Sequence, residues 1–413
     1  MASHIYGIDF GTSNSVLAVL NKETGEITKT FTESSLIYFQ DNENFYIGKQ
    51  AIEQYLHNNM RGRLLKSVKT LLPQSSFTFT VIFGKKYSAE DLVCLILKLL
   101  KSQADEFTGE NVTEVVLGRP VVFSEDSIKD KLAQDRLLKA ARMAGFEQIH
   151  FQYEPIAAGF LYEQSLTKPE LVLIGDFGGG TSDFTLMKLD KANTSKKDRK
   201  SDIIKTGGIH IGGDDMDSAI MWHKLVKYFG HGLEYKSFDK MLEMPVHIFV
   251  TLCEWDQMGF LKDGKIRKQL DSYYFWTDKN PAVLRLMNLI DHNLGFSLFQ
   301  HIEKSKIELS SGNSATIAFN EREIDIVEEI SLTEFEQIIS KEITKTENYV
   351  LAFLEKQNVT FSQVSNVFLT GGTSSIPAVK NIFEKHFTKE KISSGDNFNS
   401  VALGLALSYN YLK

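Results

Sequence analysis

One short pattern occurs twice in this chain, and it restricts the fold more than any other feature. The stretch IGDFGGGTSDFTL, from Ile174 to Leu186, sets three consecutive glycines between two runs with strand-like alternation. Glycine weakens a strand interior, so its presence there marks a tight bend or a close approach of the backbone to a ligand. The stretch YGIDFGTSNSVLAVL, from Tyr6 to Leu20, repeats the layout, and the later copy differs by two extra glycines before its Thr-Ser pair. The repeat predicts two halves, each of which opens with a hairpin.

The composition of the two turns indicates phosphate binding. A glycine turn exposes several backbone N–H groups, and a concave set of such donors binds phosphate oxygens. The acids Asp9 and Asp176, which precede the turns, would repel a phosphate unless a divalent cation lay between them. Proteins hold Mg²⁺ with one or two carboxylates together with substrate phosphates and water. We therefore expect the glycines to admit a phosphate chain and the two acids to position its metal. The alternative is a pair of ordinary hairpin turns.

Two further glycine turns stand between a predicted strand and a predicted helix. In FLTGGTSSIPAV, residues 368–379, Pro377 falls in the first turn of the helix. In IHIGGDDMDSAI, residues 209–220, either Asp214 or Asp215 is predicted to be the N-cap. A helix N-terminus behind a glycine turn favours an anion. Taken alone, each turn is equally well explained as a plain link between strand and helix. Together with the hairpins, the two turns are predicted to form walls of one cleft.

Length and composition limit the class of protein. A chain of 413 residues exceeds what one hydrophobic core organises, so we expect two or three domains. The net charge of −7 argues against nucleic acid as the main partner. The basic run SKKDRK, residues 195–200, is interpreted as a solvated loop. The two cysteines, Cys94 and Cys253, predict free buried thiols in a reducing cytoplasm. The longest apolar run, near residues 92–100, is too short to span a bilayer.

Local patterns predict several further elements. Ser88 and Asp91 form a capping box ahead of an apolar run, and Gly145 closes an amphipathic helix. The region from Glu234 to Asn293 is rich in aromatic residues and methionine and is predicted to be a separate, mostly helical subdomain. The expected elements are a helix over 86–107, a buried strand over 112–123, a helix over 127–146 and a helix over 214–229.

Two predicted helices carry small residues where another helix can approach closely. The stretch YEPIAAGFLYE, residues 153–163, sets Glu154 before a proline-initiated helix with small residues at 157–159. The stretch SVALGLALSY, residues 400–409, has small residues at 402, 404 and 406. We expect these helices to cross and form a hinge between the halves.

A third helical stretch, IEKSKIELSS, places Glu303, Lys306 and Ser310 on one face, at spacings of three and four residues. By itself this pattern is explained equally well by a solvated face with an ion pair.

In this order, the quoted stretches resemble the ATPase domain of the DnaK-type, seventy-kilodalton heat-shock chaperones, within the actin-like ATPase superfamily. GIDFGTSNS and GDFGGGTSD are similar to the family's two phosphate loops, and IHIGGDDMD and FLTGGTSSIP to its nucleoside-binding turns. YEPIAAG and SVALGLA are similar to its hinge helices, and FQYEPIAAG is most similar to the short bacterial YegD-like branch. The resemblance implies an α/β, actin-like ATPase fold with two duplicated lobes around a nucleotide cleft. Each lobe would have a core sheet, helices and a smaller inserted subdomain.

The resemblance also implies domain boundaries. The first lobe is expected over residues 1–167, with an inserted subdomain over about 36–108. The second lobe is expected over residues 168–413, with an inserted, mostly helical subdomain over about 214–300 and a hinge helix over about 398–412.

Carried over by position, the resemblance implies roles for individual residues. Asp9 and Asp176 would bind Mg²⁺ through water. Lys69, with Lys66 as a rival, would reach the γ-phosphate. Glu154 and Asp183 would lie around the metal and the attacking water, and Thr181, which would hold phosphate, is a further expected catalytic residue. The implied nucleotide-binding residues are Gly11, Thr12, Ser13, Asn14, Gly178, Gly179, Gly180, Thr181, Gly212, Gly213, Asp214, Glu303, Lys306, Ser310, Gly371, Gly372, Thr373 and Ser375. Among them, Glu303, Lys306 and Ser310 match adenosine contacts.

Two departures from the family's pattern qualify these roles. The family places arginines at the positions of Ile307 and Ser375, so we expect weak discrimination between ATP and GTP. The family's apolar linker, β-sandwich and helical lid do not appear in the sequence up to Lys413. The expected partners therefore include a client-binding protein in trans, and whether the natural chain is longer stays open.

These inferences predict a Mg-dependent, ATP-binding, slowly ATP-hydrolysing chaperone-like protein of the cytoplasm. Its expected cofactors are ATP or ADP and Mg²⁺, with K⁺ as a further cation that the resemblance allows. Its expected partners are nucleotide and a co-chaperone or client-binding protein, and not nucleic acid or membrane, while the oligomeric state stays open. The alternatives are a small-molecule kinase of the same superfamily, which needs a second polar pocket, and a non-catalytic or filament-forming scaffold.

Overall fold

The structure is a computed structural model that describes residues 2–58, 60–196, 198–237, 239–254, 257–395 and 399–411. The chain forms two compact units. The first unit contains residues 1–58, 62–213 and 345–413, and the second contains residues 59–61 and 214–344. The lobe boundaries given above stay predictions, and residues 398 and 412, at the ends of the predicted hinge helix, lie outside the described residues.

The first sheet of the first unit has the strand order β10-β9-β1-β2-β3. The first three strands in the sequence form an antiparallel meander, and β9 pairs parallel with β1. β10 pairs parallel with β9 in turn. The strands are β1 (His4–Phe10), β2 (Asn14–Asn21), β3 (Ile27–Ser34), β9 (Glu114–Arg119) and β10 (Gln148–Tyr153).

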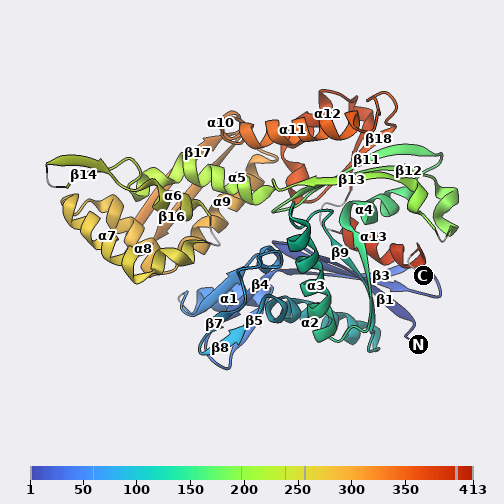
Figure 1. Ribbon diagram of the computed structural model, residues 1–413, viewed down its shortest axis with the longest axis horizontal. Coiled ribbons are helices and arrows are strands. Elements are labelled where there is room, and N and C mark those ends of the chain that lie inside the picture. Colours follow the sequence, from blue (N-terminus) through green and yellow to red (C-terminus); the bar gives the residue numbers. More distant parts are fainter. Residues whose placement is uncertain are drawn as a thin grey trace. The chain divides into compact units, whose positions relative to one another are not determined.

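The second sheet has the order β13-β12-β11-β18-β19 and repeats the first (Figure 1). A three-stranded antiparallel meander is again extended by two parallel strands. The strands are β11 (Glu170–Phe177), β12 (Ser182–Leu189), β13 (Ile203–Ile209), β18 (Asn366–Thr370) and β19 (Ile392–Ser394). The matching order and directions confirm the predicted duplication and the α/β fold class.

The strand register corrects the predicted alignment of the two hairpin turns, in which the later turn has two extra glycines. Phe10 faces Ser15 across the first hairpin, and Phe177 faces Ser182 across the second, so each turn spans four residues. The later turn therefore has no extra glycines. Its glycines replace the Thr-Ser pair of the first turn, because pairing fixes the register of a hairpin more firmly than letter matching. One pair further along, Asp9 faces Val16, whereas Asp176 faces Asp183.

Two helices of the first unit, α4 (Glu154–Glu163) and α13 (Ser400–Ser408), pack against each other as predicted (Figure 1). One buried apolar cluster joins both helices to strands of both sheets, with Ala157 and Ala402 fully buried in it. The predicted crossing of these helices is confirmed.

The remaining helices of the first unit follow their sequence signals. The predicted capping box is present, since Ser88 and Asp91 exchange side-chain and backbone hydrogen bonds at the start of α2 (Ala89–Thr108). The helix α3 (Ser127–Met143) begins after the cap Asp126 and ends before Gly145, whose φ is 99°. Two further helices are α11 (Ser340–Glu355), which begins in the second unit, and α12 (Pro377–Glu384).

A small subregion of the first unit follows β3 and carries the predicted lysines. Its elements are β4 (Leu36–Phe39), β5 (Phe45–Ile47), α1 (Lys49–His57), β6 (Arg63–Lys66), the 3₁₀ turn η1 (Val68–Leu71), β7 (Thr80–Ile82) and β8 (Lys85–Tyr87).

The second unit combines helices with two hairpins, and its first helix begins at the boundary of the first unit. Its elements are α5 (Gly213–Ile220), β14 (Glu234–Ser237), β15 (Lys240–Glu243), α6 (Val246–Cys253), α7 (Gly264–Trp276), α8 (Pro281–Asp291), α9 (Gly295–Leu309), β16 (Ser314–Glu321), β17 (Ile324–Ser331) and α10 (Leu332–Ile338). In the aromatic-rich region, residues 238, 255 and 256 lie outside the described residues. None of the helices described in either unit is both long enough and apolar enough to cross a membrane.

Two predictions for helix 214–229 need correction. The α-helix starts one residue earlier, at Gly213, so Asp214 and Asp215 lie inside its first turn and neither is the N-cap. Carboxylates are favourable there because the helix dipole is positive at that end. The α-helix also stops at Ile220 and continues as a π-helical turn over 221–225 and a 3₁₀ turn over 226–229.

The interpretation of the basic run as a solvated loop is wrong for Arg199. This side chain is buried, with 4% of the residue exposed. Its guanidinium donates to both carboxylate oxygens of Glu163, at 3.0 and 2.6 Å, and to Asp202. It also lies 4.9 Å from the ring centroids of Phe160 and Tyr411. Asp202 is only three residues away, but Glu163 and the two rings come from distant sequence positions, so the local run of charge does not reveal them.

Candidate functional site

The first unit brings all four predicted glycine turns together around residues 178–180. The carbonyl oxygen of Gly178 accepts hydrogen bonds from the N–H of Gly213 at 3.1 Å and from the hydroxyl of Thr373 at 2.9 Å. The N–H of Gly178 donates to the carbonyl of Thr181 at 2.9 Å and closes the turn. Thr373 therefore braces the second hairpin turn, with its hydroxyl already used.

Glycine is required at two of these contacts. A Cβ at Gly212 would lie 2.2 Å from the carbonyl oxygen of Gly179. Gly371 has a φ of 83°, and a Cβ there would lie 2.3 Å from the carbonyl oxygen of Phe177. Both contacts are backbone to backbone, so a side chain would push the turns apart.

The first hairpin turn reaches the second through its side chains. The hydroxyl oxygen of Thr12 lies 3.8 Å from the Cβ position of Gly180. Behind this turn, the Ser35 hydroxyl donates to the carbonyl of Gly11 at 2.8 Å, and the Ser35 N–H donates to the carbonyl of Ser13. The first hairpin turn, which ends at Asn14, is thus held in place by β3 and by Ser35, the residue that follows β3.

Four carboxylates and one lysine influence one another at the ends of the paired strands. The ammonium of Lys69 donates to Glu154 Oε1 at 2.9 Å, and both side chains are nearly buried. Glu154 is the first residue of α4, and Lys69 lies in η1. The charges of Glu154 and Lys69 both act on Asp9, Asp176 and Asp183. The group therefore holds four acids against one cation.

Burial and mutual repulsion shift the acids of this group. Burial, followed by the charge of Glu154, raises the pKa of Asp9 to about 7 and that of Asp183 to about 7. The same causes raise the pKa of Asp176 well above its ordinary value. Burial alone would lower the pKa of Lys69, but the charges of Glu154 and Asp9 raise it. The site thus has excess negative charge and would be stabilised by a cation.

Asp183 is oriented by two hydrogen bonds, one of which comes from a backbone group that no sequence motif indicates. The Thr181 hydroxyl donates to Asp183 Oδ2 at 2.9 Å. The backbone N–H of Val121 donates to Asp183 Oδ1 at 3.1 Å. Val121 follows β9 of the first sheet, so this bond links the two sheets. A backbone donor has no side-chain signal, and no motif would have indicated it.

The donor set fits Mg²⁺ bound mainly through water and phosphate. Among the residues that the structure describes, no three His, Cys, Asp or Glu side chains form a group that would by itself hold a metal ion. Mg²⁺ is commonly bound by only one or two carboxylates plus phosphates and water. Asp9 and Asp176, whose ionised forms lack enough positive charge nearby, suit that mode of binding.

The predicted adenosine contacts belong to the second unit. Glu303 and Lys306 lie on α9, and Ser310 is its C-cap, with a hydroxyl that donates to the Lys306 carbonyl at 3.1 Å. The Lys306 ammonium donates to Asp217 on α5 at 2.8 Å. Burial raises the pKa of Asp217 to about 6, although Lys306 opposes the shift. Lys306 therefore forms an ion pair, but its partner lies on another helix and its side chain is only 12% exposed, so the alternative of a solvated face does not hold for it.

Three more of the predicted nucleotide-binding residues lie in or beside elements described above. Asp214 lies in the first turn of α5, and Gly372 and Ser375 bound the 3₁₀ turn before α12. Ile307 is 63% exposed. All the roles assigned to single residues stay predictions.

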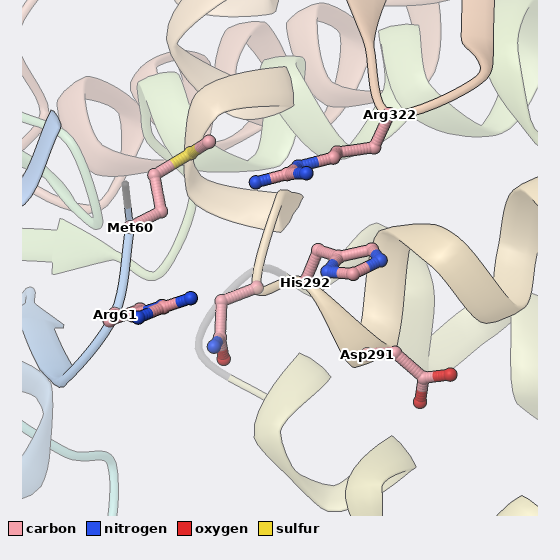
Figure 2. A pocket seen from close by; sticks show the side chains of 6 residues that line it. Met60, Arg61, Asp291, His292 and Arg322 are labelled. Carbon is pink, nitrogen blue, oxygen red and sulfur yellow. The ribbon is translucent and has the colours of Figure 1, made fainter. Parts of the chain in front are cut away.

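A pocket of about 280 Å³ lies in the second unit (Figure 2). Its lining contains none of the predicted site residues. Met60, Arg61, Asp291, His292, Asn293 and Arg322 line it.

The fold and the paired turns define the class of this protein. Two copies of one five-stranded sheet, joined by crossing helices, make up the actin-like ATPase fold.

The chain belongs to the Hsp70 family, because the family model described as Hsp70 protein matches residues 5–242 and 291–413. The proteins named Chaperone protein DnaK from two strains of Thermus thermophilus are each 25% identical to it over 441 residues. Each alignment covers 98% of this chain and 60% of the relative. The chain thus spans about 60% of the length of the curated relatives it matches.

Proposed function

We propose that this protein binds Mg-ATP at the paired hairpin turns of the first unit and hydrolyses it slowly to ADP and phosphate. The observation that carries the proposal is the group of four carboxylates and one lysine, in which Asp9, Asp176 and Asp183 lie on the two equivalent strand pairs. Such an excess of buried negative charge is costly without a bound cation. The four braced glycine turns beside it supply N–H donors for a phosphate chain.

The residues have separate roles in this proposal. Asp9 and Asp176 hold Mg²⁺ through water, and the bound ion would neutralise charge on the phosphates. Lys69, oriented by Glu154 at 2.9 Å, supplies a further positive charge to the terminal phosphate. Asp183 is held by Thr181 and Val121 and has a pKa of about 7. A carboxylate with that pKa is suited to accept a proton from an attacking water near neutral pH.

Slow hydrolysis yields little product, so we propose that the output of this protein is its nucleotide-bound state, which a partner protein recognises. A co-chaperone or a client-binding protein in trans is the partner that family membership suggests. The buried free thiols of Cys94 and Cys253 fit a reducing compartment such as the cytoplasm.

Two measurements on the purified chain test the function. Titration calorimetry with ADP should show binding that requires Mg²⁺ and is abolished by EDTA. Phosphate release from Mg-ATP should then occur with water as the only acceptor. Binding without release would leave a nucleotide-dependent scaffold, and release only after addition of a small-molecule acceptor would identify a kinase. Absence of binding at millimolar Mg-ATP would refute the proposal.

A further inference from the structure

We infer that Arg136 is a positioning residue that holds the Lys69 segment in place for phosphoryl transfer. The inference rests on the proposed function, since it assigns Arg136 to the lysine of that site. Arg136 lies on α3, 67 positions after Lys69 in the sequence, and no motif connects the two.

The guanidinium of Arg136 donates hydrogen bonds to backbone carbonyls that follow Lys69. Its Nη1 donates to the carbonyl oxygens of Leu71, Leu72 and Gln74, each at 3.0 Å. Its Nη2 donates to the carbonyl of Phe77 at 2.8 Å. One side chain therefore donates to four carbonyl acceptors within seven residues, all at or after the end of η1, and two of them, those of Leu71 and Gln74, also accept a backbone N–H.

The Lys69 segment needs such support because it has little regular structure. η1 is a single 3₁₀ turn of four residues, and turns of this length are not stable alone. The last carbonyls of a helical turn lack partners within it, and a cation at that end is favourable. Arg136 meets both needs with a planar group that binds several oxygens at once.

The other end of the segment is strained. Ser67, the residue before η1, is buried and has a φ of 57°, in the left-handed region that residues other than glycine seldom adopt. Strained residues persist only where the surroundings hold them, and they gather at functional sites. Val68 and Leu72 are buried in the core, which leaves Lys69 to point toward Glu154. Arg136 thus restrains a turn whose entry is under strain.

The consequence concerns the position of the Lys69 ammonium. Loss of four hydrogen bonds at one end should allow the turn to open locally while the rest of the unit stays folded. A displacement of about 1 Å at a catalytic group can lower a rate by about a hundredfold. Arg136 is expected to act on turnover through Lys69 and to have little effect on nucleotide binding.

The first test follows the segment itself and needs no nucleotide. Hydrogen exchange is compared between the wild-type chain, Arg136→Met and the control Lys131→Met. Lys131 is on the same helix, carries the same charge, and has a side chain that is 78% exposed. We expect the four amides of this segment that donate backbone hydrogen bonds, those of Thr70, Leu72, Gln74 and Phe77, to exchange at least about tenfold faster in Arg136→Met. Those amides should be unchanged in the control, and β11 and β12 should be unchanged in both. Unchanged exchange over 68–77 in Arg136→Met would overturn the inference.

The second test links Arg136 to Lys69 in turnover. Arg136→Met should lower kcat about tenfold or more and leave KM for Mg-ATP within about twofold. Combined with Lys69→Ala, it should cause no further loss, because the two residues act through one ammonium. Additive losses in the double variant would overturn the inference. Arg136→Lys, which keeps the charge and loses the planar fork, should lie between the wild type and Arg136→Met, and it replaces the latter if that variant does not fold. A wild-type chain without turnover would refute the proposed function, and the exchange result would then decide on Arg136 alone.

Discussion

The peptide carbonyl of Ala157 occupies the space in which any side chain at position 404 would begin. A Cβ built on Gly404 would lie 1.8 Å from that oxygen and 2.3 Å from the carbonyl carbon. The helices α4 and α13 therefore touch backbone to backbone at this point, and α13 can carry no side chain there.

Gly404→Ala should destabilise the protein, although the same change usually stabilises a helix by about 1 kcal/mol. Overpacking in a core typically costs about 1–3 kcal/mol, and here the obstructing atom is backbone, which yields less than a side chain. Urea unfolding should show a lower midpoint for this variant. Gly264→Ala is the control, because Gly264 also lies in a helix and a Cβ there meets nothing within 4 Å. Equal stability of both variants would contradict the close packing.

Asp176→Asn should have opposite effects on stability and on ligand binding. The pKa of Asp176 is raised, so its charged form is disfavoured in the folded protein, and asparagine removes that cost. The nucleotide-free variant should be at least as stable as the wild type near pH 8. Mg-dependent binding and hydrolysis should fall, because one metal-positioning carboxylate is gone. Calorimetry and denaturant unfolding measure the two effects, and full activity in the variant would remove the role in metal binding.

Lys69→Ala should slow hydrolysis more than it weakens binding. The charge of Lys69 matters most while negative charge shifts during transfer, so kcat should fall about a hundredfold. The change also leaves Glu154 buried without its partner, which should cost about 3–5 kcal/mol of stability. Single-turnover rates and nucleotide affinity separate the two effects. Collapse of affinity with unchanged turnover would make Lys69 a binding residue or transfer its role to Lys66.

Mg-nucleotide affinity should rise between pH 6 and pH 8. Asp9 and Asp183 have pKa values of about 7 in the ligand-free protein, against an ordinary 3.8. Such groups bind protons more tightly in the folded than in the unfolded chain, so their contribution favours folding at low pH and is lost as pH rises from about 4 to about 7.

A bound cation reverses this preference, because it favours the ionised acids and displaces their protons. The gain in affinity should be roughly tenfold for each carboxylate that must ionise. Calorimetry at pH 7 in buffers of different ionisation enthalpy should detect proton release. The absence of release in every buffer would show that these acids do not face the ligand.

Arg199→Met should destabilise the protein by about 3–5 kcal/mol, because it leaves Glu163 buried without a counter-charge. Lys200→Met, one residue along and exposed, is the control and should be close to neutral. Adding Glu163→Gln to the arginine variant should restore part of the loss. Chemical unfolding of the three variants and the wild type gives the comparison, and equal stability of the arginine and lysine variants would contradict the buried network.

Features with a local cause were predictable from the sequence. The capping box at Ser88, the small residues of α4 and α13 and the repeated hairpins each have a signal within a few residues. The site was less predictable wherever a distant backbone group takes part. The N–H of Val121, the ion pair of Lys306 with Asp217 and the four carbonyls held by Arg136 depend on how far-apart segments meet. Letter matching also misaligned the two turns, because only strand pairing reveals that both have four residues.

The unequal pairing across the two hairpins has a consequence for the direction of the chemistry. The sheets are copies in order and direction, yet Val16 faces Asp9 where Asp183 faces Asp176. The earlier copy has the buried Val16 at that position, and the later copy has Asp183, the residue that we propose as the proton acceptor. Two identical hairpins would place equivalent groups on both sides of a bound phosphate, and neither side would then be preferred for attack by water. Asp183→Val would make this position equivalent in the two hairpins, and under the proposed function it should leave nucleotide binding in place and remove the group that accepts the proton of the attacking water.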